Sequence, residues 1–288
     1  MILIADSGST KCDWLVIDST GQRHGDFSTM GFNPYFHSTT FVVNQLGETP
    51  QVTAVANAVE HVFFYGAGSS TPNLCKVITD ALKQVFPKAK VVVEHDLLGA
   101  AYAVYDGRPC IASILGTGSN SCHFDGETLS EEVPALAYIL GDEGSGSWFG
   151  KALLRAYFYK QLPDDIRTAF EETYTLTKDE LVHCVYGNPH ANVWLASFMP
   201  FISRFRDHAL IREWMRDGLR TFVNIHVKCF ADYRTTPCHF VGSVAWYFSD
   251  VLADVCKEEG IPLGNIVQKP IETLADYHVR YLIPQLQR

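Results

Sequence analysis

The sequence lacks a long hydrophobic run and a long basic run. It carries 23 Lys and Arg residues against 32 Asp and Glu, which gives a formal net charge of −9 over 288 residues. An acidic chain without a basic run argues against a nucleic-acid surface. No stretch approaches the roughly 18 apolar residues that a membrane span needs, and Ile2–Ala5 is far too short for a signal peptide. These absences predict a cytoplasmic protein that binds neither nucleic acid nor membrane.

The eight cysteines form no C-x-x-C pair, and no Cys/His spacing matches a zinc site. Most of them lie in apolar stretches, so buried thiols in a reducing compartment are favoured over disulfides. Hydrophobic residues make up 47% of the chain and charged residues 19%. This composition is sufficient for the core of one large domain or of two ordinary ones.

One local pattern occurs twice along the chain. In "MILIADSGSTKCDWLVIDSTGQ" an apolar strand (2–5) leads through a small-residue loop (6–11) into a second strand (12–18). In "CIASILGTGSNSCHFDGET" the same order recurs as a strand (110–115), a loop (116–120) and a strand (121–124). The repeat, about one domain length apart, indicates an internal duplication with diverged sequence.

Strands and helices alternate between the two copies, which predicts an α/β fold. Strands are expected at 62–65 and 90–94, and helices at 73–86 and 97–105. After residue 141 the chain is mainly helical, with a strand and a Gly-Ser turn near 238–243, a strand-like piece at 264–270 and a closing helix at 273–286. The predicted helices of this part are 144–160, 164–173, 177–186, 191–207 and 209–232. We expect two lobes, 1–110 and 111–288, with the last helix returning to the first lobe.

The loops that follow the two repeated strands are candidate phosphate cradles. Glycine allows backbone N–H groups to approach an anion closely, and Ser and Thr hydroxyls add donors. The first loop is neither a Walker A loop nor a dinucleotide fingerprint, because it leads into a strand instead of a helix. Either loop alone could be an ordinary turn, but the duplicated pair favours phosphate binding.

Three further stretches carry candidate site residues. Asp96 in "VVVEHDLLGAAYA" follows a strand and opens a helix, where it could accept a proton from a substrate hydroxyl or simply cap the helix. Asp142 and Glu143 lie among four glycines in "ILGDEGSGSWFG", where they could bind sugar hydroxyls or begin a helix. Asn33 precedes a proline in "TMGFNPYF", and its amide suits a polyol.

Taken together, these motifs identify a resemblance to a known family. "DSGSTK", "GFNPY", "GAGSS", "EHDLLGAA", "LGTGSNS", "LGDEGSGSWFG" and "FVGSVAW" occur in this order over about residues 2–246. They resemble the N-acetylglucosamine kinases and the wider BadF/BcrA-type ATPase family. The resemblance implies the duplicated ribonuclease-H-like, actin-like ATPase fold, with two lobes around a cleft for nucleotide and sugar.

The resemblance also implies roles for particular residues. Asp96 matches the catalytic base that deprotonates the sugar 6-hydroxyl, and Asp6 is expected to face Mg²⁺ through water. Sugar-binding positions are Asn33, Asp96, Asp142 and Glu143, with Ser69 expected in the same pocket. ATP and phosphate contacts are expected from Asp6, Ser7, Gly8, Ser9, Thr10 and Lys11, from Gly116, Thr117, Gly118, Ser119 and Asn120, and from the adenosine motif Gly242 and Ser243.

Three stretches depart from the family pattern. Ser7 stands where the family usually has Gly, "VPALAYI" replaces a Gly-Gly-Trp-Gly-like stretch that shapes the sugar pocket, and "KPIETLADYHVRYL" replaces a Gly/Ala-rich C-terminal segment. The substrate could therefore be N-acetylglucosamine or another sugar, such as N-acetylmuramic acid or glucosamine. The second departure bears on the N-acetyl contact and the third on how the adenosine pocket is completed.

We predict an ATP-dependent kinase that uses Mg²⁺ to phosphorylate an amino sugar. Two alternatives are an ATPase activator of an iron–sulfur dehydratase and a sugar-sensing regulator. The scattered cysteines do not resemble the cluster ligands of the activators, and the chain lacks the zinc-type Cys/His cluster of ROK proteins. The family also implies a homodimer.

Overall fold

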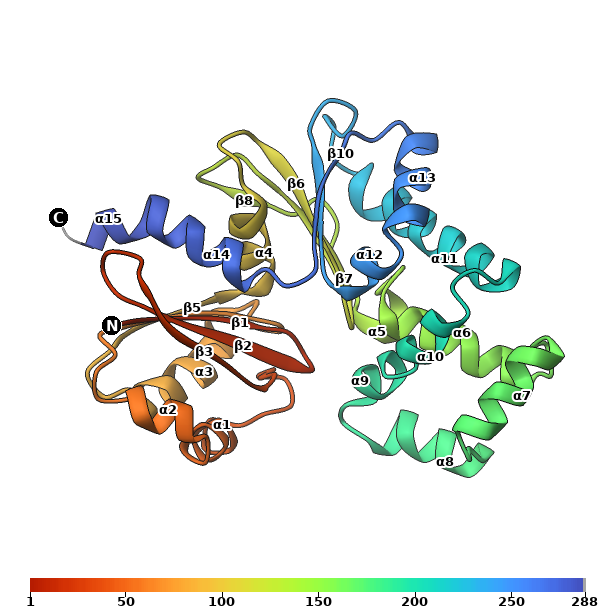
Figure 1. Cartoon of the computed structure of the whole chain (residues 1–288), viewed down its shortest axis with the longest axis horizontal. Coiled ribbons are helices and arrows are strands. Elements are labelled where there is room, and N and C mark those ends of the chain that lie inside the picture. The colour runs from red at the N-terminus through yellow and green to blue at the C-terminus, as the bar shows by residue number, and fades with distance from the viewer. Residues whose placement is uncertain (287–288) are drawn as a thin grey trace. The chain divides into compact units, whose positions relative to one another are not determined.

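The computed structural model describes residues 1–286, which divide into two compact units (Figure 1). Unit 1 comprises Met1–Ala112, Phe124–Leu129 and the segment that begins at Lys269, and unit 2 comprises Ser113–His123 and Ser130–Gln268. No helix in the described part of the chain is both long enough and apolar enough to cross a lipid bilayer.

The sheet of unit 1 has the strand order β3-β2-β1-β4-β5. Its strands are β1 (Ile2–Ser7), β2 (Lys11–Ile17), β3 (Arg23–Met30), β4 (His61–Gly66) and β5 (Lys90–His95). The first three strands are antiparallel neighbours, whereas β4 and β5 continue the sheet in parallel with β1. Because β1, β4 and β5 are parallel, the loops that follow them leave the same edge of the sheet.

Alternation along the strands of unit 1 gives the sheet two apolar faces. Leu3 and Trp14 face the helices on one side, and Ile4 and Leu15 face those on the other. The first side is covered by α1 (Thr39–Gly47), α2 (Pro50–Val55) and α3 (Pro72–Val85) (Figure 1). The second side is covered by α4 (Asp96–Val104), α14 (Ile271–Tyr277), the π-helical segment η3 (His278–Leu282) and α15 (Ile283–Leu286).

The second sheet, most of whose residues belong to unit 2, repeats this arrangement. Its strands are β6 (Cys110–Leu115), β7 (Ser119–Phe124), β8 (Leu129–Ser130), β9 (Cys238–Val241) and β10 (Leu263–Val267). Their order is β10-β9-β6-β7-β8. Read from β8 to β10, the third, second, first, fourth and fifth strands of this sheet follow one another, as they do in unit 1. The duplication predicted from the two loops is therefore confirmed at the level of strand order.

Unit 2 also holds most of the helices. They are α5 (Ala137–Leu140), α6 (Gly146–Phe158), α7 (Asp164–Thr173), α8 (Lys178–Val182), η1 (His183–Gly187), α9 (Ala191–Ala196), α10 (Met199–Arg204), α11 (Ala209–Phe222), η2 (Val223–Val227), α12 (Ser243–Tyr247) and α13 (Ser249–Glu259). Two predicted helices were wrong in extent. The one expected over 191–207 is interrupted before α10, whose first turn contains Pro200, and proline is tolerated there but not inside a helix. The one expected over 209–232 ends with η2 at Val227.

Candidate functional site

The first predicted phosphate loop joins β1 to β2 and packs closely against the segment that follows β3. Ser7 is fully buried, and its Oγ accepts a hydrogen bond from the Phe32 N–H at 3.0 Å. The Gly31 N–H donates to the Thr10 carbonyl at 3.1 Å. A Cβ at Gly31 would lie 2.0 Å from the Gly8 carbonyl oxygen, so only glycine fits at this approach. The serine that departs from the family pattern is thus a structural acceptor.

Asp6, at the end of β1, lies among other carboxylates. It is directly opposite Asp13 in the antiparallel register. Burial, together with the charges of Asp96 and Asp13, raises the pKa of Asp6 to about 7, and Lys11 only partly opposes this effect. The Lys11 ammonium pairs with Asp13 at 2.6 Å. The first loop therefore presents carboxylates whose mutual repulsion a bound cation would relieve.

Asp96 begins helix α4, directly after β5. The N-cap of this helix is His95, whose side chain makes no capping hydrogen bond, so the alternative prediction of Asp96 as the N-cap was wrong by one residue. The Asp96 carboxylate lies 3.1 Å from His95 Nε2 and is partly exposed. The effect of Asp96 on the pKa of Asp6 shows that the two carboxylates share one neighbourhood.

The predicted sugar residues of unit 1 lie on two adjoining loops. Asn33 is buried, and its Oδ1 accepts the Tyr35 N–H at 3.0 Å. A Cβ at Gly68 would lie 2.3 Å from that same oxygen, which brings "GFNPY" and "GAGSS" into contact. Ser69 is buried as well, and its Oγ has no hydrogen-bond partner in the described structure. Buried hydroxyls are normally paired, so this one is available to a ligand.

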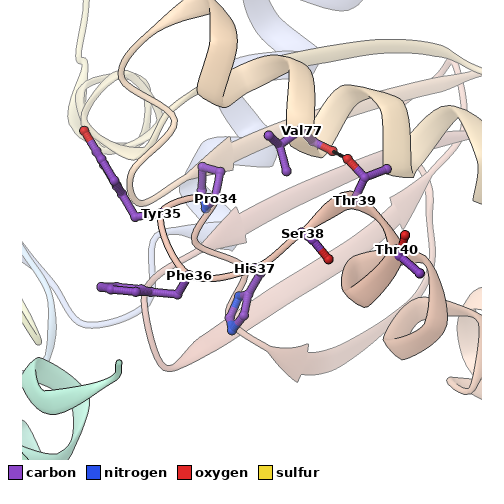
Figure 2. A pocket seen from close by; sticks show the side chains of 8 residues that line it. All are labelled: Pro34, Tyr35, Phe36, His37, Ser38, Thr39, Thr40 and Val77. Atoms are coloured by element: carbon purple, nitrogen blue, oxygen red, sulfur yellow. Dashed lines mark hydrogen bonds between the residues drawn. The ribbon is translucent and has the colours of Figure 1, made fainter. Parts of the chain in front are cut away.

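A hollow of about 500 Å³ adjoins these loops in unit 1 (Figure 2). It is lined by the residues 34–40 and by Val77, and the Thr39 hydroxyl donates to the Val77 carbonyl at 3.0 Å. The exposed rings of Tyr35 and Phe36 project to one side of the loop (Figure 2). Polar and aromatic side chains of the residues that follow Asn33 therefore line this open hollow.

The second predicted phosphate loop joins β6 to β7 in unit 2. Its backbone is held by the start of helix α6, because the Gly146 N–H donates to the Gly116 carbonyl at 2.8 Å and the Ser147 N–H to the Thr117 carbonyl at 3.1 Å. The Gly116 N–H donates to the Gly118 carbonyl at 3.0 Å. These bonds fix the loop as a compact turn beside "GDEGS".

Asp142 lies against this loop. It is buried and has a left-handed backbone with φ of 58°. Its Oδ1 accepts the Ser119 N–H at 3.2 Å, and a Cβ at Gly118 would come within 3.0 Å of both carboxylate oxygens. Burial raises the pKa of Asp142 to about 6, against the lowering effects of the Ser119 N–H and of Lys151. The Asp142 carboxylate therefore touches the second predicted phosphate loop itself.

Glu143 and Asn120 have partners within the protein. The Glu143 carboxylate lies 3.1 Å from Nε2 of the buried His226, and the Asn120 amide donates to Glu131 Oε2 at 3.0 Å. The predicted roles of Glu143 in sugar binding and of Asn120 in phosphate binding stay predictions. His226 was not identified from the sequence, since it lies 83 positions from Glu143 in an ordinary helical pattern.

The predicted adenosine motif also reaches the second loop. Gly242 has φ of 120°, and a Cβ there would lie 2.4 Å from the Leu115 carbonyl oxygen and 3.2 Å from the Gly116 nitrogen. Ser243 begins α12 and is exposed. The predicted residues thus gather in two groups. Those of unit 1 lie at or just after the ends of β1, β3, β4 and β5, and those of unit 2 lie just after β6 and β9, at the start of β7 and just before α6.

Comparison with known structures defines the class of protein. A ROK family glucokinase from Streptomyces griseus, solved in complex with glucose and AMPPNP, has a TM-score of 0.56 at 16% identity, with 96% of this chain and 98% of that chain covered. A Chromobacterium violaceum protein assigned as N-acetylglucosamine kinase has a TM-score of 0.63 at 15% identity, with coverage of 96% and 98%. These likenesses and the repeated strand order define a two-domain α/β protein with the fold of sugar kinases and actin-like ATPases.

A stronger likeness identifies the family. A Porphyromonas gingivalis protein that carries the assignment of N-acetylglucosamine kinase is 37% identical, with a TM-score of 0.91 and with 98% of this chain and 99% of that chain covered. The chain belongs to this N-acetylglucosamine kinase family of the BadF/BcrA type. No protein-family model matches the chain, and no curated protein matches it.

Proposed function

We propose that this protein is an ATP-dependent kinase that phosphorylates the 6-hydroxyl of N-acetylglucosamine or of a related amino sugar. The observation that carries the proposal is the 37% identity over nearly the whole chain to an assigned N-acetylglucosamine kinase. The two small-residue loops at equivalent strand ends, with Asp96 beside the first and Asp142 beside the second, support it.

Asp96 is proposed as the general base. Its partly exposed carboxylate accepts the proton of the sugar 6-hydroxyl as the oxygen attacks the γ-phosphorus of ATP. In unit 1, Asn33 and the unpartnered Ser69 hydroxyl are proposed to bind sugar hydroxyls. In unit 2, the Asp142 carboxylate is proposed as a further sugar ligand. Positioning by these contacts supplies much of the rate enhancement in phosphoryl transfer.

Asp6 is proposed to hold Mg²⁺ through water. In the described part of the chain no group of three or more His, Cys, Asp or Glu residues could hold a metal ion. Mg²⁺ keeps several waters and needs only one or two carboxylates beside substrate phosphates. Burial is the main cause of the raised pKa of Asp6, and the charges of Asp96 and Asp13 add to it; these neighbouring carboxylates support the proposal of a cation there. When bound, Mg²⁺ would neutralise charge on the phosphates.

The ATP contacts of unit 1 are proposed from the turn of residues 6–11, and those of unit 2 from residues 116–120 together with Gly242 and Ser243. The backbone N–H groups and hydroxyls of the turns supply donors for phosphate oxygens. The eight cysteines are all thiols in the structure, which supports the proposal of a cytoplasmic location. The homodimer stays a prediction.

A coupled assay of ADP release tests the proposal. The protein is incubated with Mg-ATP in four separate reactions, each with one sugar: N-acetylglucosamine, N-acetylmuramic acid, glucosamine or glucose. Turnover on N-acetylglucosamine supports the proposal as stated. Turnover on another amino sugar alone supports the kinase activity and replaces N-acetylglucosamine as the proposed substrate. Hydrolysis of ATP that no sugar accelerates would contradict the kinase and favour an ATPase activator.

A further inference from the structure

We infer that a hydrogen-bonded chain within unit 2, from His226 through Glu143 and Ser119 to Asp142, makes the binding of sugar and the binding of nucleotide interdependent. His226 acts in it as a positioning residue. The inference rests on the proposed function, because it takes Asp142 as a sugar ligand and the loop that contains Ser119 as a phosphate ligand.

The first link is the attachment of Ser119 to two successive acidic residues. Its N–H donates to the Asp142 carboxylate at 3.2 Å, and its hydroxyl donates to the Glu143 main-chain carbonyl at 2.8 Å. Ser119 is 5% exposed, so water does not readily replace these partners. The close approach of Gly118 to the same carboxylate leaves no free space between them. A displacement of residues 142–143 therefore displaces the phosphate loop.

The second link holds Glu143 from outside the loop. His226 is 3% exposed, and its Nε2 lies 3.1 Å from a Glu143 carboxylate oxygen. Because an ionised carboxylate only accepts hydrogen bonds, Nε2 carries the proton in this pair. Nδ1 is buried and has no partner in the described structure. Among the described residues, the His226 imidazole therefore makes its hydrogen bond with Glu143 of the "GDEGS" segment.

The third link fixes His226 itself. It lies in η2, a π-helical segment that continues α11, and π-helical turns within helices frequently occur at functional sites. Its ring stacks on Phe222 with a centroid distance of 5.1 Å, and its carbonyl accepts the Ser121 hydroxyl, next to the second loop. The chain of contacts therefore starts from η2 and closes back on β7.

This arrangement explains how one ligand affects the other. Hydroxyls of a sugar that donate to Asp142 hold its carboxylate in place, and that carboxylate in turn holds the Ser119 N–H. The bound sugar thus restrains this compact turn further before the phosphates arrive, so less conformational entropy is lost on nucleotide binding. Coupling between two sites typically changes affinity by about 5–150-fold, and it must be reciprocal.

The test is calorimetric titration of the full-length protein with Mg-AMPPNP, with and without saturating N-acetylglucosamine or the amino sugar that the ADP-release assay identifies. His226→Leu removes the donor to Glu143, whereas His226→Gln keeps an amide donor. Ser119→Ala breaks the chain at a second point. His239→Leu is the matched control, because His239 is a similarly buried histidine of unit 2 whose Nδ1 accepts the Asn265 N–H at 2.9 Å.

We expect sugar to tighten AMPPNP binding by about 5-fold or more in the wild type and in His239→Leu. In His226→Leu and Ser119→Ala the ratio should fall towards 1, and His226→Gln should restore most of it. A lower melting temperature with an unchanged ratio would reduce His226 to a structural residue and overturn the inference. Binding of both ligands without coupling in the wild type would also overturn it while sparing the proposed function. If the wild type binds neither ligand, both fail.

Discussion

The two predicted phosphate loops occupy equivalent places in sheets of identical strand order, yet they differ in chemistry. The first, in unit 1, presents Asp6 close to Asp96 and Asp13, and it depends on the close approach of Gly31 for its shape. The second, in unit 2, has no carboxylate of its own, and hydrogen bonds with residues 142–147 hold it. The duplicated fold therefore determines where each loop lies. The segments packed against a loop determine whether carboxylates surround it or hydrogen bonds hold it.

The largest effect should come from Asp96→Asn, which removes the proposed base beside the first loop. We expect kcat to fall by about 10²–10⁴-fold, the usual contribution of general-base catalysis. The far-ultraviolet circular dichroism should be unchanged, because Asp96 is partly exposed and is not the N-cap of α4. Full activity in a folded variant would reduce Asp96 to a helix-terminal residue.

Gly31→Ala is a second substitution expected to disturb the first loop, against which Gly31 packs. The new Cβ would meet the Gly8 carbonyl at 2.0 Å, so the backbone must move and displace the loop. A misplacement near 1 Å can lower activity by about 10²-fold, and we expect kcat/KM to fall by that order. Gly47→Ala is the matched control, since nothing lies within 4 Å of its added Cβ. Equal activity in both variants would show that the loop tolerates the shift.

Asp142→Asn sharpens the comparison on the second loop through its pH dependence. The pKa of Asp142 is raised from 3.8 to about 6 in the folded protein, so folding favours the protonated acid. Wild-type stability therefore declines as pH rises through about 4 to 6, and the loss is complete above that range. The asparagine, which can still accept the Ser119 N–H, avoids this loss.

The free energy of unfolding in urea, measured at pH 4 and pH 7, checks this prediction. Relative to the wild type, Asp142→Asn should gain up to about 3 kcal/mol between the two pH values. Asp164→Asn, at a highly exposed acid of the same unit, should gain much less. A variant that loses stability relative to the wild type as pH rises would contradict the raised pKa.

The smallest effect is expected from Ser7→Ala in the first loop. The substitution leaves the buried Phe32 N–H without its acceptor, which should cost about 1–2 kcal/mol of unfolding free energy. Ser9→Ala, in the same loop but only partly buried, should change stability little. Equal unfolding midpoints for the two variants would show that water replaces the Ser7 hydroxyl.

Most of the architecture could be predicted from the sequence where apolar runs end in small residues. The strands before both loops, and the α/β order between them, follow from such runs at 2–5 and 110–115. Strand β3 was not predicted, because "RHGDFSTM" is largely polar and exposed at the edge of the sheet. Helices α1 and α2 follow it in a stretch to which no element had been assigned.

The details of the site could be predicted less well, because they depend on contacts between distant segments. The approach of Gly31 to Gly8 and the pairing of Glu143 with His226 have no local sequence signal. Ser7 was predicted as a phosphate contact and noted as a departure from the family pattern, but its use as an acceptor for Phe32 emerges only from the fold. Loop positions are thus set locally, whereas their electrostatics and rigidity are tertiary properties.

The most direct test of the central claim is to identify the phosphorylated product. The wild type and Asp96→Asn would each be incubated with Mg-ATP and N-acetylglucosamine, and the products followed by ³¹P and ¹³C NMR. The account predicts a phosphomonoester at carbon 6 that forms at least about 10²-fold more slowly with the variant. If only inorganic phosphate appears, or if the two proteins form the ester at equal rates, the assignment of this chain as an amino-sugar kinase with Asp96 as its base is contradicted.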